Sequence, residues 1–404
     1  MARIVVLGGC GGIGSVASRA LAAAGEDVVV ADLDQQRAGE LADEIGADSM
    51  ACDASSAQSL RLAMNGADVV VNCVGPFYRF GPPILAAAID AGVDYVDVCD
   101  DLAPTRLMLD LDATARAAGV TALLGMGNSP GIANVFVRLC AEQLLDEVET
   151  VDIMHVHGGE PEEGAGVLKH RIHAMVNPVP LYVDGEFREV QQLEADGQAF
   201  VREFDFRDVG RMPVFPYPHP ETITLPRHFP GLRRATNLGV IFPLPYFERT
   251  QDLVRVGACS DEPLSVGGVE VTPLDVSVAL LQRQRPTFLQ AAGVTGPAGC
   301  LAVEVGGRKG SERHRYVFQL SSRAAGAGEG TGIPAAVGAL LMAGGKVAGP
   351  GVVPPEAGVR PMDFLPLAFD LMARLNVSAG GESGIVHLEH VGPDGSRDVI
   401  PLGL

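Results

Sequence analysis

Apolar runs and helix-like segments alternate regularly along the first third of the chain. Runs rich in valine, isoleucine and leucine recur, as in "ARIVVL", "DVVVADLD" and "ADVVVNCVG", and segments of small and apolar residues separate them. A run that is apolar on both faces is typical of a buried parallel strand. Six such strands with crossover helices within about 125 residues predict a doubly wound parallel sheet, the Rossmann fold.

The pattern changes in the second part of the chain. Residues 147–159 alternate between apolar and polar positions, which places His155 and His157 on one face of a strand. Residues 301–320 contain two alternating stretches around a glycine-containing turn. We therefore expect a second, α+β domain with a mostly antiparallel sheet, covered by helices such as residues 331–345.

These patterns divide the chain into parts. We expect a dinucleotide-binding domain at residues 1–131 and a second domain at residues 132–345. Residues 351–376 predict a proline-rich connection and one helix. The small, glycine-rich residues 321–332 predict a mobile loop.

The densest group of glycines follows the first strand directly, in "GGCGGIG". Its spacing satisfies G-x-G-x-x-G between a strand and a helix, where backbone N–H groups can approach a pyrophosphate and the helix N-terminus favours the anion. Asp32 ends the next strand, about 20 residues on, where an acid binds the adenosine ribose. A glycine-rich turn without a ligand is the alternative. The predicted dinucleotide-binding residues are Gly8, Gly9, Gly11, Gly12, Ile13, Gly14, Asp32, Asp53, Cys73, Val74, Gly75 and Pro76.

The residue at the end of the second predicted strand also bears on the choice between NAD and NADP. The Asp32 carboxylate accepts hydrogen bonds from a ribose 2′-hydroxyl and repels a 2′-phosphate, which favours NAD. Arg37 lies a few residues on and leaves NADP possible.

Composition limits the kinds of partner. The net charge of −20 argues against nucleic acid and against an anionic membrane surface, because both require clustered positive charge. The seven cysteines form no C-x-x-C pair, and we find no apolar run of membrane-spanning length and no signal-peptide pattern. We expect a cytoplasmic protein with reduced thiols.

The three loops that follow the fourth, fifth and sixth predicted strands carry a resemblance. The stretches "VVNCVGPFYRFGPPILAAAIDAGVDYVDVCDD" and "AGVTALLGMGNSPGIANV" resemble the saccharopine dehydrogenase-like family, as does the opening "VLGGCGGIG". Later segments, "FPGLRRATNLGVIF" and "GGRKGSERHRYVFQL", are similar to the same family. The resemblance implies a nicotinamide-linked oxidoreductase that acts at a C–N bond of an amino acid or amine. It also implies that residues 132–345 form a substrate-binding and dimerisation domain and that residues 346–404 pack back on the first domain.

Candidate catalytic residues follow the fifth predicted strand. Oxidising an amine requires a group that takes a proton, and a carboxylate beside the nicotinamide is suited to handling it. Asp97 falls on an aspartate of the family's pattern and is our first candidate, with Asp100 as the second. For Asp100 and Asp101, capping of the following helix is the alternative.

Substrate recognition is expected largely from the second domain. Arginine binds a carboxylate bidentately, so local groups of arginine and histidine in an acidic chain are candidates for holding a substrate. Exposed charges on a loop are the alternative, and we expect no metal site because no third ligand accompanies the histidine pairs. The predicted substrate-binding residues are Tyr78, Asn128, Ser129, Pro130, His170, Arg171, His173, Glu221 and Thr222.

The sequence thus favours an NAD(P)-dependent amine or amino acid dehydrogenase, or an imine reductase, that binds a small molecule and forms a homodimer. A trans-acting enoyl reductase, which reduces a C=C bond, is the nearest enzymatic alternative. A dinucleotide-binding regulator without turnover is the alternative from another class.

Overall fold

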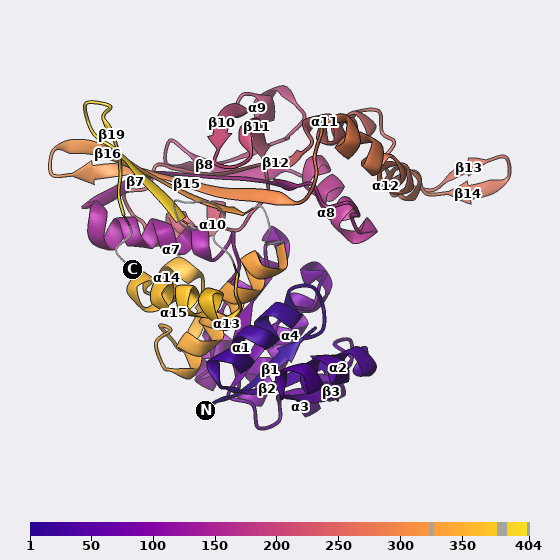
Figure 1. The fold of residues 1–404 in the computed structure, drawn as a ribbon, viewed down its shortest axis with the longest axis vertical. Coiled ribbons are helices and arrows are strands. Elements are labelled where there is room, and N and C mark those ends of the chain that lie inside the picture. Colours follow the sequence, from indigo (N-terminus) through magenta and orange to yellow (C-terminus); the bar gives the residue numbers. More distant parts are fainter. Residues whose placement is uncertain (323–326, 378–385, 402–404) are drawn as a thin grey trace.

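A seven-stranded parallel sheet forms the first layer of the computed structural model, which describes residues 1–322, 327–377 and 386–401 (Figure 1). The central strands Arg3–Leu7, Asp27–Asp32 and Val69–Asn72 are buried on both faces, as their apolar sequences predict. In spatial order the seven strands are β17 (Gly351–Val353), β6 (Thr121–Leu123), β5 (Asp94–Asp97), β4 (Val69–Asn72), β1 (Arg3–Leu7), β2 (Asp27–Asp32) and β3 (Asp48–Ala51). The predicted Rossmann sheet is confirmed, with β17 as a seventh strand that the sequence did not suggest.

Helices cover both faces of this sheet. The crossover helices are α1 (Gly14–Ala24), α2 (Gln35–Ile45), α3 (Ala57–Met64), α4 (Phe77–Ala91), α5 (Leu102–Leu109) and α6 (Asp112–Ala118). Three helices from the far end of the chain join them, namely α13 (Ala327–Ala343), α14 (Pro355–Gly358) and α15 (Pro361–Arg374).

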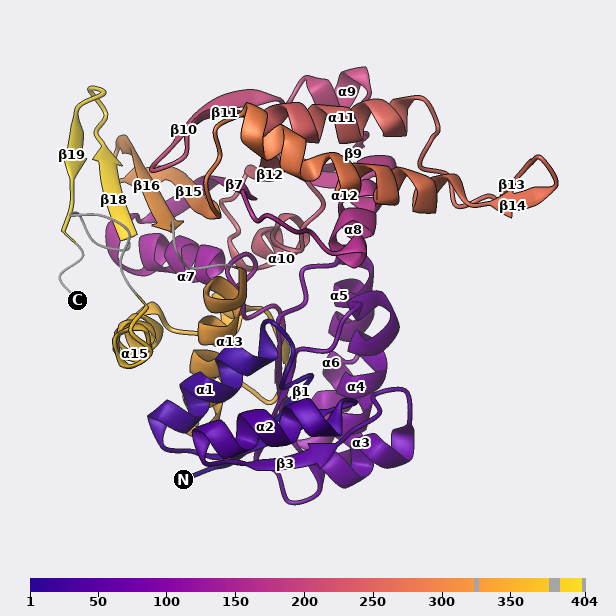
Figure 2. The same cartoon turned by 45° about the vertical axis from the view of Figure 1, so that its right-hand side comes forward.

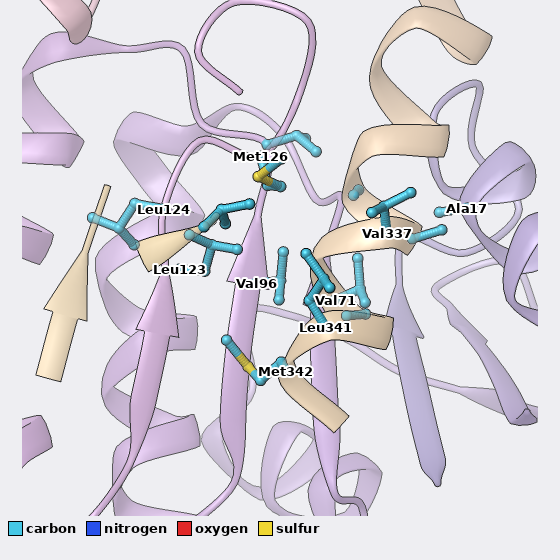
Figure 3. Packing of buried hydrophobic residues seen from close by; sticks show 14 of the residues in the cluster. Ala17, Val71, Val96, Leu123, Leu124, Met126, Val337, Leu341 and Met342 are labelled. Carbon is cyan, nitrogen blue, oxygen red and sulfur yellow. The ribbon is translucent and has the colours of Figure 1, made fainter. Parts of the chain in front are cut away.

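Helix α13 packs on the parallel sheet, whereas we expected it to cover the antiparallel one. Its side chains Val337, Leu341 and Met342 lie against the strands that carry Val71 and Val96 (Figure 3). The helix also touches α1 closely, since a Cβ on Gly332 would lie 2.7 Å from the carbonyl oxygen of Ile13. The sequence of α13 is small and apolar all round, so no amphipathic face indicated which sheet it covers.

A ten-stranded sheet forms the second layer and is mostly antiparallel, as predicted. Its central strands run in the order β11, β12, β7, β15, β16, and only β12 and β7 are parallel neighbours. Its strands are β7 (Glu147–Gly158), β8 (Val179–Val183), β9 (Glu186–Val190), β10 (Arg202–Phe206), β11 (Gly210–Pro216), β12 (Arg234–Phe242), β15 (Ala298–Lys309), β16 (Glu312–Ser322), β18 (Val386–Val391) and β19 (Arg397–Val399).

The end of the chain departs from two expectations. Strands β18 and β19 extend the second sheet beside β16, so residues 386–399 do not pack on the first domain. Of the predicted loop at residues 321–332, residues 323–326 lie outside the described residues, and helix α13 begins at Ala327. Helix α15 lies beside α13 and α1 of the first domain (Figure 2).

The other helices of the second domain surround its sheet. They are α7 (Ile132–Leu139), the π-helix η1 (Cys140–Leu144), α8 (Ala165–Val176), α9 (Ala195–Gln198), α10 (Glu221–His228), α11 (Leu244–Arg255) and α12 (Pro273–Ala291). Helices α7 and α10 lie between the two sheets (Figure 1). The hairpin of β13 (Leu264–Val266) and β14 (Val269–Val271) projects away from the body of the molecule (Figure 2). No helix in the described part of the chain is both long and apolar enough to cross a membrane.

Candidate active site at the carboxyl edge of the parallel sheet

The glycine-rich turn joins β1 to α1. Gly8 has a φ of +71°, and a Cβ on Gly9 would lie 2.7 Å from the carbonyl oxygen of Val6, so neither position accepts another residue without strain. A Cβ on Gly14 would overlap the carbonyl of Gly8. Gly12 differs, because a Cβ there would meet no protein atom within 4 Å. The turn therefore leaves open space at the N-terminus of α1, where a pyrophosphate binds in this fold.

The adenosine end of the predicted site lies at the end of β2. Asp32 accepts hydrogen bonds from the backbone N–H of Cys10 and of Asp34, both at 3.2 Å. Arg37 donates to the Cys10 carbonyl at 3.0 Å and so lies beside the same turn. Asp53 is exposed after β3 and accepts two hydrogen bonds from Ser55, which hold the pKa of its carboxyl below the usual value.

The loop after β4 continues the same edge of the sheet. The side chain of Asn72 accepts a hydrogen bond from the backbone of Val74 at 2.9 Å, which fixes the loop as it leaves the strand. Gly75 and Pro76 are exposed and Cys73 is half-buried, and burial raises the pKa of its thiol to about 12. Because its thiol is neutral, Cys73 contributes its shape and its backbone groups to this edge of the sheet.

Asp97 is completely buried, which conflicts with direct contact between its carboxylate and a substrate. The carboxylate accepts hydrogen bonds from the Tyr95 hydroxyl at 2.9 Å and from the backbone N–H of Cys99 and Gly125 at 3.1 and 2.6 Å. Burial raises its pKa to about 6, although these hydrogen bonds act in the opposite direction. Asp97 thus ties the loops after β5 and β6 together and positions the residues around it.

The next two aspartates do face the space above the sheet. Asp100 and Asp101 are half-buried, and the Asp101 carboxylate lies 3.5 Å from Nδ1 of His170 on helix α8. Asp101 stands at the N-cap of α5 but makes no side-chain capping hydrogen bond, so the capping alternative does not hold for it. Burial and the charge of Asp100 raise the pKa of Asp101, and the neighbouring imidazoles counteract them.

Aromatic and imidazole rings from the second domain gather opposite these carboxylates. His155 and His157 share one face of β7, as predicted, with ring centroids 6.2 Å apart. The rings of Tyr217 and His219, on the segment between β11 and α10, lie 5.2 and 5.4 Å from that of His155. Gly239 on β12 makes room for this arrangement, because a Cβ there would lie 2.6 Å from Nε2 of His155.

A chain of polar side chains connects these rings to the loop after β6. His219 Nδ1 lies 3.4 Å from Glu221 Oε2, and the other oxygen of Glu221 accepts a short hydrogen bond from the Ser129 hydroxyl. Asn237 on β12 donates to that hydroxyl at 3.3 Å, and its amide oxygen lies 3.1 Å from Nε2 of His155.

The two central histidines have opposite pKa shifts. Burial and the nearby His219 hold the pKa of His155 well below the usual histidine value. Burial acts in the same direction on His219, but the carboxylates of Glu221, Asp100 and Asp101 outweigh it and raise the pKa. At neutral pH, His155 is therefore neutral, and His219 is the histidine of this pair that gains a proton more readily.

Several predicted substrate-binding residues have structural partners instead. Arg171 is only 2% exposed, and its guanidinium pairs with Glu163, so it is not available to bind a substrate carboxylate. The Thr222 hydroxyl donates to the His219 carbonyl at 2.9 Å, and Glu221 is buried. Thr222 and Glu221 thus help to hold His219 in position.

The other predicted substrate-binding residues differ in how far they are exposed. His173 is exposed, and Tyr78 is 71% exposed on the first turn of α4. Ser129 and Asn128 are half-buried after β6, and Pro130 beside them is buried.

The candidate site list missed Tyr217, His219 and Asn237. The signal for the first two was present in "YPHPETITLP", where His219 stands two residues before the predicted Glu221. Nothing local indicated Asn237, because its role depends on the packing of β12 beside β7.

The residues at this edge fit a nicotinamide dinucleotide. The open space at Gly12 and the Asp32 carboxylate would hold the pyrophosphate and the ribose. The Oδ1 atom of Asn128 is buried without a hydrogen-bond partner among the described residues, as expected for a polar atom that a ligand completes.

A cation would fit beside the predicted substrate residues. Asp100, Asp101 and His170 each offer one ligand atom, and these atoms lie within 4.8 Å of one another. The three groups could share a metal ion or a substrate ammonium group.

Comparison with known proteins agrees with this geometry. The family model of the saccharopine dehydrogenase NADP binding domain matches residues 4–123. The chain is 25% identical over 370 residues to the carboxyaminopropylagmatine dehydrogenase of Synechocystis sp.. The aligned region covers 86% of this chain and 90% of that protein. It is 28% identical over 320 residues to the carboxynorspermidine synthase of Vibrio alginolyticus, and the aligned region covers 70% of this chain and 71% of that protein.

Similarity to a solved structure extends over nearly the whole length of the chain. The saccharopine dehydrogenase (L-Glu forming) of Saccharomyces cerevisiae covers 97% of this chain and 100% of its own, with a TM-score of 0.69 at 16% identity, which shows a shared fold. The resemblance to the saccharopine dehydrogenase-like family is confirmed, and with it the prediction of an NAD(P)-dependent oxidoreductase.

Proposed function

We propose that this saccharopine dehydrogenase-like oxidoreductase oxidises the C–N bond of a small cationic amine or amino acid, or reduces the corresponding imine. One observation carries the proposal. Atoms of the Asp100 and Asp101 carboxylates and of the His170 imidazole lie within 4.8 Å of one another at the carboxyl edge of the Rossmann sheet, where ligands bind in such sheets. This is an arrangement that attracts a protonated nitrogen.

The chemistry requires the nitrogen to change its protonation state. An amine must be neutral before the neighbouring C–H bond can lose a hydride, whereas an imine accepts a hydride more readily once its nitrogen is protonated. A bound nicotinamide dinucleotide accepts or supplies that hydride. Asp100 and Asp101 would hold the cationic nitrogen, and the histidines opposite would move its proton.

The relatives suggest which compounds to test first. Their names refer to carboxyaminopropylagmatine and carboxynorspermidine, compounds that combine a carboxylate with several basic nitrogens. Purified protein would be given NAD⁺ or NADP⁺ with each of these compounds, and with lysine and saccharopine, while reduced nicotinamide is measured. We expect turnover of at least one of them.

A matched pair of variants tests the role of the two carboxylates. Asp101→Asn is expected to raise the KM for a cationic substrate about tenfold, which corresponds to about 1.4 kcal/mol. Asp90→Asn, an exposed aspartate on α4, is the control and is expected to leave KM unchanged. An unchanged KM in Asp101→Asn would remove the basis for a cationic substrate.

The other two functions considered above become outcomes of the same assay. Reduction of an enoyl substrate without turnover of any amine or imine would indicate C=C chemistry. Tight NADH binding without turnover of any compound would indicate a regulator.

We also propose NAD rather than NADP as the preferred dinucleotide. Asp32 supports this choice, because its carboxylate lies where a 2′-phosphate would be placed. The ratio of kcat/KM for NAD⁺ over NADP⁺ is expected to exceed one in the wild type and to fall in Asp32→Ser. A wild-type ratio below one would contradict the proposal.

A homodimer is a further part of the proposal. The projecting hairpin exposes Leu264, Val266 and Val269 by 56, 61 and 63%, and an isolated two-stranded hairpin is marginally stable by itself. Contact with a second copy would bury these side chains. We also propose a cytoplasmic location, where reducing conditions keep thiols such as the seven free cysteines reduced.

A further inference from the structure

The segment between β11 and α10 and the start of α10 bring a buried histidine and a buried glutamate together. His219 is 6% exposed and Glu221 is 1% exposed, and Nδ1 of the first lies 3.4 Å from Oε2 of the second. A buried carboxylate is costly unless it is paired and hydrogen-bonded. Glu221 accepts a hydrogen bond from Ser129 through Oε1, and its Oε2 faces His219 without a hydrogen bond. The arrangement therefore fixes which nitrogen of the imidazole faces the glutamate.

The other nitrogen of the imidazole remains available. Among the described residues, no hydrogen bond involves Nε2 of His219, and the contact between Nδ1 and Glu221 is an ion-pair distance rather than a hydrogen bond. The charges of Asp100 and Asp101 also act on His219. A histidine whose one nitrogen faces a buried carboxylate and whose other nitrogen is unpaired is arranged as a general acid or base.

We propose that His219 exchanges the proton of the substrate nitrogen through Nε2, and that Glu221 positions it. The inference rests on the proposed function of the site. The surrounding residues keep the imidazole in place, since the Thr222 hydroxyl donates to the His219 carbonyl and the ring packs against those of Tyr217 and His155.

The step balances in both directions. In oxidation, neutral His219 takes a proton from the substrate ammonium. The freed nitrogen lone pair then forms the C=N bond as the carbon loses its hydrogen, with the bonding electron pair, to the oxidised dinucleotide. In reduction, a hydride adds to the carbon of the iminium, the C=N electron pair returns to nitrogen, and protonated His219 supplies the proton.

Several ionisable groups surround the imidazole and set its titration. Glu221 on α10 and the pair Asp100 and Asp101 after β5 favour the protonated form, and burial disfavours it. His155 and His157 on β7 also interact with it, and the pKa of each is lowered by burial. The base of the oxidation reaction is therefore expected to titrate above the ordinary histidine value of 6.5.

Two variants with a matched control test the proposal. His219→Gln is expected to lower kcat for amine oxidation by about 10²- to 10⁴-fold and to abolish the acidic limb of its pH profile. Glu221→Gln removes the neighbouring charge and is expected to move that limb to lower pH by about one unit, a change that a merely structural role would not produce. The control is His228→Gln, at an exposed histidine on helix α10, which also carries Glu221. It is expected to change neither kcat nor the acidic limb.

The outcomes separate this inference from the function on which it rests. Far-UV circular dichroism and NADH binding would first verify that each variant folds. If the wild type is active and the acidic limb of the pH profile is unchanged in both Glu221→Gln and His219→Gln, the role of His219 is overturned and the amine chemistry remains. An inactive wild type with every amine and imine would instead reject the proposed function.

Discussion

Replacing Asp97 with asparagine is expected to change how the stability of the protein depends on pH. The side chain is fully buried, and its pKa is about 6 in the folded protein against 3.8 as the ordinary value. Because the folded chain binds this proton more tightly, the contribution to stability is fully present below pH 3.8 and is lost as the pH rises through 6. The complete difference is about 3 kcal/mol, of which about 2 kcal/mol falls between about pH 4.5 and about pH 7.5.

The asparagine variant lacks this titration but keeps most of the hydrogen bonds. Its amide oxygen can still accept from the backbone of Cys99 and Gly125, and only the hydrogen bond from Tyr95 is lost, at a cost of about 1 kcal/mol at any pH. The free energy of unfolding of the wild type minus that of the variant is therefore expected to fall by about 2 kcal/mol from about pH 4.5 to about pH 7.5.

Urea unfolding measures this difference at the two pH values. Far-UV circular dichroism is the suitable probe, because the chain contains no tryptophan. Other titrating groups cancel between wild type and variant. A difference that does not change with pH would refute the reasoning, since it would mean that Asp97 is solvated and open to the cleft, as contact with a substrate requires.

Four further predictions concern the site and the assembly. Gly12→Ala is expected to fold normally but to weaken NADH binding at least tenfold, whereas the control Gly39→Ala in helix α2 leaves binding unchanged. Equal NADH affinities of the two variants in a fluorescence titration would contradict a pyrophosphate at the turn. Gly239→Ala displaces the His155 ring and is expected to lower kcat about tenfold or more while NADH affinity is kept; wild-type kcat would show that the ring can shift harmlessly. Chelators are expected to leave activity intact, because the acidic pair binds substrate; activity that is lost and then restored by a divalent metal would indicate a metal ion there instead. Val266→Asp is expected to yield monomers in light scattering, and an unchanged mass would exclude the hairpin as the interface.

The sequence predicted the parts of the fold that depend on local pattern. The buried strands β1, β2 and β4 are apolar on both faces, and the glycines at 8, 9 and 14 are required by backbone geometry, so both were visible without a structure. The carboxyl edge of the sheet then followed from topology, and the structure places Asp100 beside Asp101 and His170 and joins Ser129 to Glu221 there.

What the sequence did not predict depends on contacts between distant segments. Arg171 looked available because nothing local showed that Glu163 would pair with it in a buried site. Asp97 was the first catalytic candidate because it falls on an aspartate of the family's pattern, and nothing local showed that the backbone N–H of Gly125, 28 residues away, would donate to its carboxylate. The link between Ser129 and Glu221 spans 92 residues and exists only because the second domain folds over the first.

Deuterium transfer tests the central claim most directly. Protein supplied with an amine, a carbonyl compound and NADH or NADPH deuterated at C4 would be analysed for labelled product by mass spectrometry. The account predicts one deuterium on the carbon bonded to nitrogen in the amine product. Deuterium on a carbon of a reduced C=C bond, with none beside nitrogen, would contradict it.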